Sequence, residues 1–264
     1  MDLKLNNKTA LVTGSTAGIG FAIAERLARE GARVIINGRT QKRVAFAIQS
    51  LQLKVREGTF EGFAADLSHK KGCAALIRGL PKVDILVNNL GIFEPKPFEE
   101  ISDDDWLHFF EVNVMSGVRL SRAYLPGMKK QNWGRVIFIS SESAVHIPAE
   151  MVHYGMTKTA QIAIARGMAE TCAGTGVTVN SVLAGPTASE GVSEFIERLS
   201  KEHDMSTAQF EKEFFRSMRP TSLVKRFLKP EEIASVVAFV CSPEASAVTG
   251  AALRAEGGVV KAAL

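Results

Sequence analysis

Short apolar runs alternate with longer helical patterns along almost the whole chain, and this alternation limits the possible folds more than any other feature. Parallel strands need a long crossover between them, so the pattern is typical of βαβ units. The runs are almost continuously apolar, as expected of strands covered on both faces. The sequence therefore predicts an α/β protein with a doubly wound, seven-stranded parallel sheet and helices on both faces. Strands are expected over Thr9–Thr13, Arg33–Asn37, Gly58–Ala64, Asp84–Asn88, Arg135–Ser140, Val177–Leu183 and Ala251–Ala255, and helices near residues 18–30, 40–53, 68–79, 103–130, 150–174 and 230–241.

The length and composition fit one domain. Of the 264 residues, 46% are hydrophobic and 23% are charged. A chain of this size buries roughly three quarters of its unfolded surface, and neither a repeat nor a linker divides it. We therefore expect a single domain over residues 1–264, and the composition excludes disordered, collagen-like and disulfide-stapled classes.

Charge and cysteine content narrow the expected partners and compartment. The 32 basic and 28 acidic residues are spread along the chain without a basic stripe, so no nucleic acid is expected as a partner. The start of the chain lacks an apolar signal core, and no stretch approaches the roughly 18 apolar residues of a membrane span. Cys73, Cys172 and Cys241 fit reduced core thiols. The expected compartment is the cytoplasm, with no membrane partner. Neither His146 nor His153 has a partner at a zinc-binding spacing, so no metal site is expected.

One segment, residues 187–229, is far longer than an ordinary connection between a strand and a helix. Two apolar stripes at helical spacing predict that it is a helical insert. It would serve as a lid over an active site, as a subunit contact or as extra packing. The stripes are Val192, Phe195, Ile196 and Leu199, and then Phe210, Phe214, Phe215 and Met218.

A glycine-rich turn follows the first predicted strand and opens the first helix. Without side chains, glycines let a pyrophosphate approach the free N–H groups and the positive end of the helix. The alternative interpretation is a tight connection with no ligand. The candidate cofactor contacts in this turn are Gly14, Ser15, Thr16, Gly18, Ile19 and Gly20.

Arg39 and Thr40 follow the second strand, where a carboxylate would bind the 2′-hydroxyl of NAD. The segment 37–40 has no acidic residue. Because a guanidinium can form paired hydrogen bonds with a 2′-phosphate, Arg39 favours NADP(H) over NAD(H). The alternative is that Arg39 only begins a solvated helix with Lys42 and Arg43.

Two further segments fall at the carboxyl ends of predicted strands. Asp66, followed by Leu67, is placed to accept a hydrogen bond from an adenine amine, and it also fits a turn or helix cap. Asn88 to Gly91 closes the fourth strand, where ligands bind in open α/β folds; the alternative is a plain turn. Asn89 and Gly91 are the candidate cofactor contacts there.

Tyr154 and Lys158 are four residues apart, so they share one face of a predicted helix. Taken alone, this spacing also fits a solvated pair. A tyrosine with a pKa of about 10 is a poor base at neutral pH, and a neighbouring ammonium lowers that pKa. A serine at the end of the fifth strand, Ser140 or Ser141, would hold a substrate oxygen while Tyr154 moves the proton.

These motifs follow one another in a fixed order: Thr13-Gly14-x-x-x-Gly18-x-Gly20, Asp66, Asn88-Asn89-x-Gly91, Asn113, Ser141, Tyr154-x-x-x-Lys158, Asn180 and Gly257-Gly258. On them the chain resembles the short-chain dehydrogenase/reductase family along essentially its whole length. Within that family it is similar to the 3-oxoacyl-(acyl carrier protein) reductase-like members. The separation of 13 residues between Ser141 and Tyr154 is the usual one for the family and selects Ser141 over Ser140 and Ser143.

The resemblance implies a Rossmann fold and a proton relay. Tyr154 would be the general acid in reduction, Ser141 would orient the substrate oxygen, and Lys158 would bind the nicotinamide ribose and lower the pKa of Tyr154. Asn113 would hold a water connecting Lys158 to solvent; the alternative is a buried asparagine with its hydrogen bonds satisfied. The family also implies a homo-oligomer, a tetramer or a dimer, with the helices at 103–130 and 150–174 at an interface.

The chain departs from the family pattern at three places. Leu90 stands where an alanine is usual, and Glu256 replaces a common aspartate before Gly257. The segment 184–187 replaces the usual Pro-Gly after the sixth strand, where nicotinamide-side contacts are expected from Gly185, Pro186 and Thr187. None of these changes removes a catalytic group.

His146, Glu142 and Glu150 flank the catalytic segment. They would either line a substrate pocket or belong to a solvated loop.

Two functions are consistent with the sequence. The first is an NADP(H)-dependent carbonyl reductase or alcohol dehydrogenase, whose small-molecule substrate is an apolar or acyl-thioester ketone; the aromatic stripes of the insert motivate the apolar substrate. The second is an NADP-binding regulatory or scaffold protein that keeps the fold without turnover. The intact set of Ser141, Tyr154, Lys158 and Asn113 argues against the second function.

Overall fold

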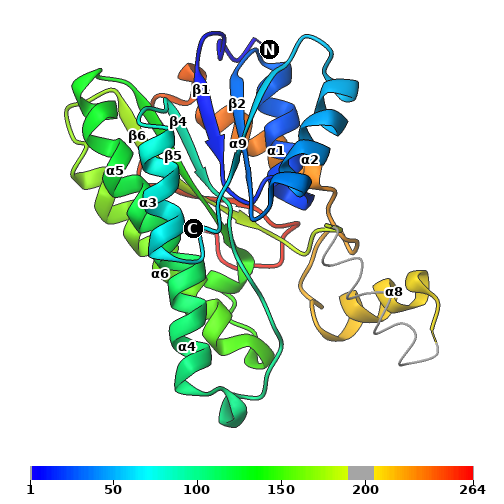
Figure 1. The fold of residues 1–264 in the computed structure, drawn as a ribbon. Helices are drawn as coiled ribbons and strands as arrows, with labels where there is room; N and C mark the ends of the chain where they lie inside the picture. The colour runs from blue at the N-terminus through cyan, green and yellow to red at the C-terminus, as the bar shows by residue number, and fades with distance from the viewer. Residues whose placement is uncertain (1, 190–204, 264) are drawn as a thin grey trace.

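Seven parallel strands form one sheet in the order β3-β2-β1-β4-β5-β6-β7 in the computed structural model, which describes residues 2–189 and 205–263 (Figure 1). The order reverses between β1 and β4, as in a doubly wound sheet, and ligands bind such folds at the carboxyl edge near that point. The strands are β1 (Thr9–Val12), β2 (Arg33–Gly38), β3 (Thr59–Ala64), β4 (Ile85–Asn88), β5 (Gly134–Ser141), β6 (Val177–Ala184) and β7 (Ala252–Ala255).

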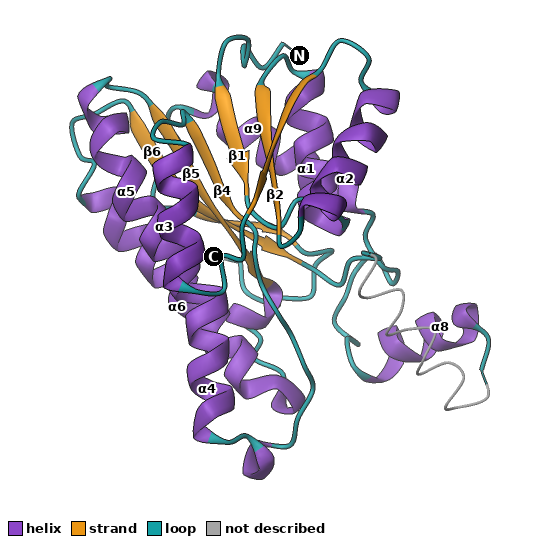
Figure 2. Ribbon diagram, viewed as in Figure 1, coloured by secondary structure: helices purple, strands orange, loops and turns teal. Residues whose placement is uncertain are grey.

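Helices cover both faces of this sheet, so the fold has three layers (Figure 2). On one face α1 (Gly18–Arg29), α2 (Gln41–Lys54) and α9 (Pro230–Cys241) bury a core that includes Leu27 and Val237. On the other face, α3 (Lys70–Gly79), α5 (Ser116–Lys130) and α6 (Val152–Glu170) cover a second core, which includes Leu86 of the sheet and Leu120 of α5. Each fully buried side chain of this size contributes roughly 1.5–3 kcal/mol to the free energy of unfolding. The predicted fold class is confirmed, with strand boundaries within one residue of expectation.

Two strands are less buried than the sequence suggests. β3 lies at one edge of the sheet and exposes Thr59 and Glu61, and β7 at the other edge exposes Ala252 and Arg254. An edge strand has a neighbour on one side only, so its faces are less completely covered. The expectation of almost continuous burial therefore holds for the inner strands and is wrong for these two.

The helix predicted over 103–130 is interrupted. It consists of α4 (Asp103–Phe110), a π-helical turn over Glu111–Met115, and α5. Ser102 and Asp105 form a capping box at its start. The wider turn leaves the Asn113 carbonyl available to the Gln161 side-chain amide, whose Nε2 donates to it over 2.6 Å. Such turns occur frequently at functional sites.

The long insert is helical where the structure describes it. The second apolar stripe lies on α8 (Thr207–Ser217), whose Phe210, Phe214 and Phe215 are buried together with Phe227. The first stripe, over Val192 to Leu199, lies outside the described residues. In Figure 1 the gold α8 extends away from the body of the sheet.

The two ends of this insert are joined by backbone hydrogen bonds. Thr187 and Leu228 form an isolated parallel bridge. The Leu228 N–H donates to the Pro186 carbonyl and the Ala188 N–H to the Leu228 carbonyl, both over 2.8 Å. The insert therefore begins and ends at one narrow neck, and near its end the Leu223 and Val224 N–H groups also donate to the Gly257 carbonyl after β7.

Cys73, Cys172 and Cys241 are buried and unbridged, as the sequence predicts for core thiols. Within residues 2–189 and 205–263, no helix is long and apolar enough to cross a membrane. In the same ranges, no group of three or more His, Cys, Asp or Glu side chains is placed to hold a metal ion.

Candidate active site

The glycine-rich turn has a backbone that side chains would disturb. Gly14 and Gly18 have φ angles of +60° and +57°, which residues with a Cβ rarely adopt. At Gly20 a Cβ would lie 2.5 Å from the Asn89 amide nitrogen and 2.6 Å from the Gly14 carbonyl oxygen. The turn thus keeps backbone N–H groups open at the start of α1, which suits a phosphate.

Polar side chains behind the turn fix its shape. Ser15 is fully buried; its Oγ donates to the Val12 carbonyl over 2.7 Å and accepts the Asn37 N–H over 3.0 Å. The Asn37 Oδ1 accepts the Gly14 N–H over 3.2 Å, and the Asn89 amide donates to the carbonyls of Thr13 and Gly14. The side chains of Ser15 and Asn89 thus hold the turn from behind. Sequence reasoning missed Asn37, although a polar residue at the end of an apolar strand was a signal.

A groove of about 1220 Å³ runs from this turn to the end of β3. Arg39, Lys42 and Arg43 line one part of it, and Asp66 and Leu67 line another. Further lining comes from Gly14, Thr16, Gly18, Ile19, Gly20, Asn89 and Gly91.

Arg39 is exposed and lines the same part of the groove as Lys42 and Arg43. An anionic ligand in the groove can therefore reach its guanidinium. Thr40, beside it, caps α2 by accepting the Arg43 N–H over 3.3 Å. Asp66 accepts hydrogen bonds from the Ser68 N–H and hydroxyl, and these bonds hold the pKa of the Asp66 carboxyl below its usual value. Asp66 therefore forms the predicted turn and lines the groove at the same time.

A second cavity, of about 240 Å³, adjoins the groove, and Ile19, Asn89 and Gly91 line both. Ser141, at the end of β5, and Tyr154 and Lys158, on α6, line this cavity, which we call the catalytic cavity after the residues predicted to be catalytic. The segment after β6 adds Gly185, Pro186 and Thr187. The structure thus brings together three of the four residues predicted to be catalytic.

Lys158 lies deep in this cavity. Its Nζ donates to the Ile139 carbonyl over 2.9 Å and to the Gln161 Oε1 over 3.4 Å, and it lies 5.6 Å from the centre of the Tyr154 ring. Burial lowers the pKa of the Lys158 ammonium to about 8.

Tyr154 has a pKa above its ordinary value. Burial is the main cause, and the Glu142 carboxylate adds to it, while the Ser141 hydroxyl and the Arg219 charge act in the opposite direction. The lowering of this pKa by Lys158 stays a prediction, because burial outweighs the neighbouring groups in the structure. A phenol that keeps its proton at neutral pH suits the role of a general acid.

Asn113 stands behind the cavity, on the π-helical turn. Its Oδ1 accepts the Ile92 N–H over 2.8 Å, and its Nδ2 donates to the Ile92 carbonyl and to the Thr157 hydroxyl, each over 3.0 Å. Asn113 is buried and its carbonyl accepts the Gln161 amide, which fits the alternative of a buried, satisfied asparagine; its role in holding a water stays a prediction. Gln161 links Asn113 to Lys158, and sequence reasoning missed it.

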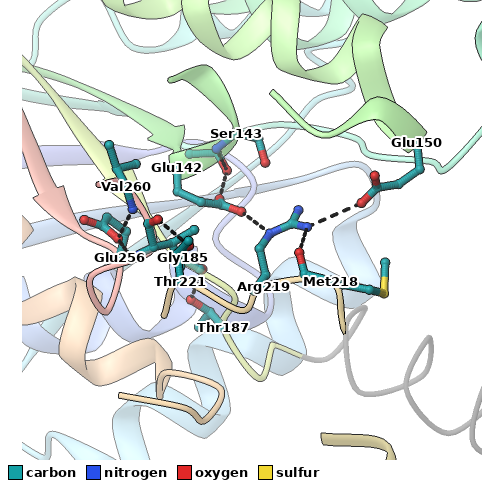
Figure 3. A network of polar contacts seen from close by, with 12 residues as sticks. Glu142, Ser143, Glu150, Gly185, Thr187, Met218, Arg219, Thr221, Glu256 and Val260 are labelled. Atoms are coloured by element: carbon teal, nitrogen blue, oxygen red, sulfur yellow. Dashed lines mark hydrogen bonds and ion pairs between the residues drawn. The ribbon is translucent and has the colours of Figure 1, made fainter. Parts of the chain in front are cut away.

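The Ser141 hydroxyl donates to the Glu142 carboxylate and accepts the Ser143 N–H. Glu142 is buried and forms an ion pair with Arg219, which also contacts Glu150 (Figure 3). Glu142 and Glu150 therefore line the cavity, whereas His146 is exposed. Sequence reasoning missed Arg219, because nothing in the sequence relates the insert to the end of β5.

Comparison with known proteins agrees with this geometry. Residues 8–200 match the family model described as short chain dehydrogenase. The chain belongs to the short-chain dehydrogenase family. The family that the motifs indicate is thereby confirmed.

Relatives of this short-chain dehydrogenase include the uncharacterized oxidoreductase YvaG of Bacillus subtilis strain 168, which is 51% identical over 99% of both chains. The 3-oxoacyl-(acyl-carrier-protein) reductase FabG of Aquifex aeolicus is 35% identical over 98% of this chain and 100% of its own. A solved structure of L-sorbose reductase from Gluconobacter frateurii, complexed with NADPH and L-sorbose, superposes with a TM-score of 0.92 at 29% identity, covering 99% of this chain and 100% of that chain. The short-chain dehydrogenase is therefore an oxidoreductase by family.

Proposed function

We propose that this short-chain dehydrogenase interconverts a ketone and a secondary alcohol with NADP(H). The observation that carries the proposal is the catalytic cavity itself: Ser141, Tyr154 and Lys158 surround a space that opens beside the groove of the glycine-rich turn. A carbonyl group in that space would lie between a proton donor and the dinucleotide groove. The match to L-sorbose reductase, a structure complexed with NADPH, supports the choice of cofactor.

The residues present fit a dinucleotide. Gly20 lets the turn close against the Asn89 amide and the Gly14 carbonyl, where a Cβ would clash, and Arg39 offers a planar guanidinium to a 2′-phosphate at the edge of the groove. When bound, the nicotinamide supplies or accepts the hydride. Asp66 lines the groove near Arg39 and would receive the adenine side.

The protein's own groups handle the proton. In reduction, Tyr154 donates its phenolic proton to the substrate oxygen as that oxygen gains negative charge. Ser141 lies beside Tyr154 and holds the same oxygen by a hydrogen bond. The Lys158 ammonium, fixed on the Ile139 carbonyl, favours the phenolate that remains on Tyr154. In oxidation the proton moves in the opposite direction.

The cavity walls favour a ketone with an apolar group. Phe93, Phe210, Phe214 and Phe227 line it, so the α8 segment (residues 205–229) contributes most of the aromatic wall. Phe215, although buried, packs against Phe214 and Phe227, with ring centres 5.1 Å apart in each pair, outside the cavity lining. This difference provides a matched pair of variants.

Replacing Phe214 with alanine is expected to raise KM for a large apolar ketone by about 5- to 30-fold, the effect of losing roughly 1–2 kcal/mol of apolar contact. KM for a small ketone should change little. Phe215→Ala, the control, loosens the same aromatic cluster and should affect both ketones equally. Steady-state kinetics on the two substrates measure this, and an equal effect of Phe214→Ala on both would contradict a wall that contacts substrate.

The proposed function itself is tested by following NADPH and NADH oxidation by the purified protein with a panel of ketones that includes an acetoacetyl thioester. Turnover with NADPH supports the enzyme. Saturable NADPH binding without turnover on any ketone would favour a regulatory or scaffold protein of the same fold. The cavity that gathers Ser141, Tyr154 and Lys158 argues against that second function.

A further inference from the structure

A buried ion pair joins the α8 segment to the end of strand β5. Arg219 follows α8 by two residues, and Glu142 follows β5 directly. The Arg219 Nε lies 3.0 Å from the Glu142 Oε1, and the two side chains are only 6% and 5% exposed. The Arg219 Nη1 also donates to the Met218 carbonyl over 2.9 Å and lies 3.4 Å from the Glu150 Oε1 (Figure 3).

The same carboxylate holds the catalytic serine. While the Glu142 Oε1 contacts Arg219, the Glu142 Oε2 accepts the hydrogen bond from the Ser141 hydroxyl. The two oxygens of this buried carboxylate therefore contact two parts of the molecule: one contacts the α8 segment, and the other contacts the serine at the end of β5. A buried carboxylate without a cation is costly, so the ionised Glu142 depends on Arg219 to remain in place.

We propose that Glu142 and Arg219 are positioning residues that make the alignment of Ser141, and with it the reaction, depend on docking of the α8 segment. The inference rests on the proposed function. When the segment docks, Arg219 neutralises Glu142, and Glu142 fixes the direction of the Ser141 hydroxyl. When the segment is displaced, Glu142 loses its cation, and the Ser141 hydroxyl loses the fixed acceptor that orients it.

The charges around Tyr154 determine in which direction each substitution shifts the pKa of Tyr154. Glu142 and Glu150 come from the loop after β5, Lys158 lies one turn along α6, and Arg219 comes from the α8 segment. Glu142 disfavours the Tyr154 phenolate, and Arg219 favours it. Removal of Arg219 alone therefore raises the pKa of Tyr154, and removal of Glu142 alone lowers it.

The test compares Arg219→Met, Glu142→Gln and the double variant with the wild-type holoenzyme. Arg219→Met should lower kcat/KM at least tenfold and move the alkaline limb of the kcat–pH profile upward, whereas Glu142→Gln should move it downward. In the double variant the loss should be smaller than the product of the two single losses. Hydrogen exchange of the α8 segment should rise in Arg219→Met. The control is Arg216→Met, which removes an exposed partner of Glu213 on α8 and should change none of these readouts.

Three outcomes overturn the inference. Faster exchange with an unchanged kcat–pH profile means that Arg219 only holds the fold. Losses that multiply in the double variant mean that the two residues act independently. Kinetics and exchange that match the Arg216 control mean that the pair does nothing. If Arg219→Met fails to fold, Arg219→Lys keeps the charge and should retain the direction of the pH profile with a smaller loss. A wild-type protein that reduces no ketone contradicts the proposed function, and the inference falls with it.

Discussion

Replacement of Tyr154 by phenylalanine is expected to lower kcat for ketone reduction by about 10²- to 10⁴-fold, the usual contribution of a positioned general acid. The variant loses one hydroxyl in a cavity whose other walls stay as they are. Dinucleotide binding should therefore persist, because the groove of the glycine-rich turn is built from other segments. Stopped-flow turnover and a fluorescence titration with NADPH measure the two effects separately.

The chain contains a matched control for this variant. Its only other tyrosine, Tyr124, is buried on α5 and donates its hydroxyl to the Leu80 carbonyl over 2.8 Å, away from the catalytic cavity. Tyr124→Phe removes the same atom from a structural position and should leave kcat within about twofold, since its cost is one hydrogen bond of roughly 1 kcal/mol in stability. Equal kcat values for Tyr154→Phe and the wild type would contradict the role of Tyr154 as proton donor.

Arg39→Gln is expected to raise KM for NADPH by about tenfold to a hundredfold, the loss of a charged hydrogen bond to phosphate. KM for NADH should change little, because NADH lacks the 2′-phosphate. The ratio of kcat/KM values for the two cofactors therefore measures what Arg39 contributes.

Arg33→Gln is the control for this variant. Arg33 lies at the opposite end of the same strand, β2, where it pairs with Glu61 on the exposed edge of the sheet. It should leave the cofactor ratio unchanged. A ratio equally unaffected by Arg39→Gln would show that Arg39 only begins a solvated helix, which is the alternative interpretation of the sequence.

The inner strands could be predicted from the sequence because continuous apolar runs indicate strands that are buried on both faces. β5 and β6 are buried at every position, and both were expected to within one residue at each end. The π-helical turn over Glu111–Met115 could not be predicted, because no local pattern indicates it and Gln161, which bonds to the Asn113 carbonyl, lies 48 residues further along the chain.

The candidate site likewise contains residues that local motifs predict and residues that only tertiary contacts bring into place. Gly14, Ser141, Tyr154 and Lys158 lie in local motifs whose chemistry depends on spacing along the chain. Arg219 meets Glu142 across 77 residues, through an insert whose path no local pattern determines. The groups proposed to be catalytic can thus be identified in the sequence, whereas the groups that surround them depend on tertiary contacts.

The narrow neck at Thr187 and Leu228 bears on how such a protein can evolve. Because backbone hydrogen bonds close the neck, the length of the intervening chain can change at little cost: the entropy of closing a loop rises by only about 0.6 kcal/mol when its length doubles. Gene segments coding for the insert could therefore be exchanged, and substrate range changed, without rebuilding the dinucleotide groove. Arg219 lies inside the exchangeable part and Glu142 outside it. Any replacement must bring its own cation to the buried carboxylate, which limits the inserts that this scaffold can accept.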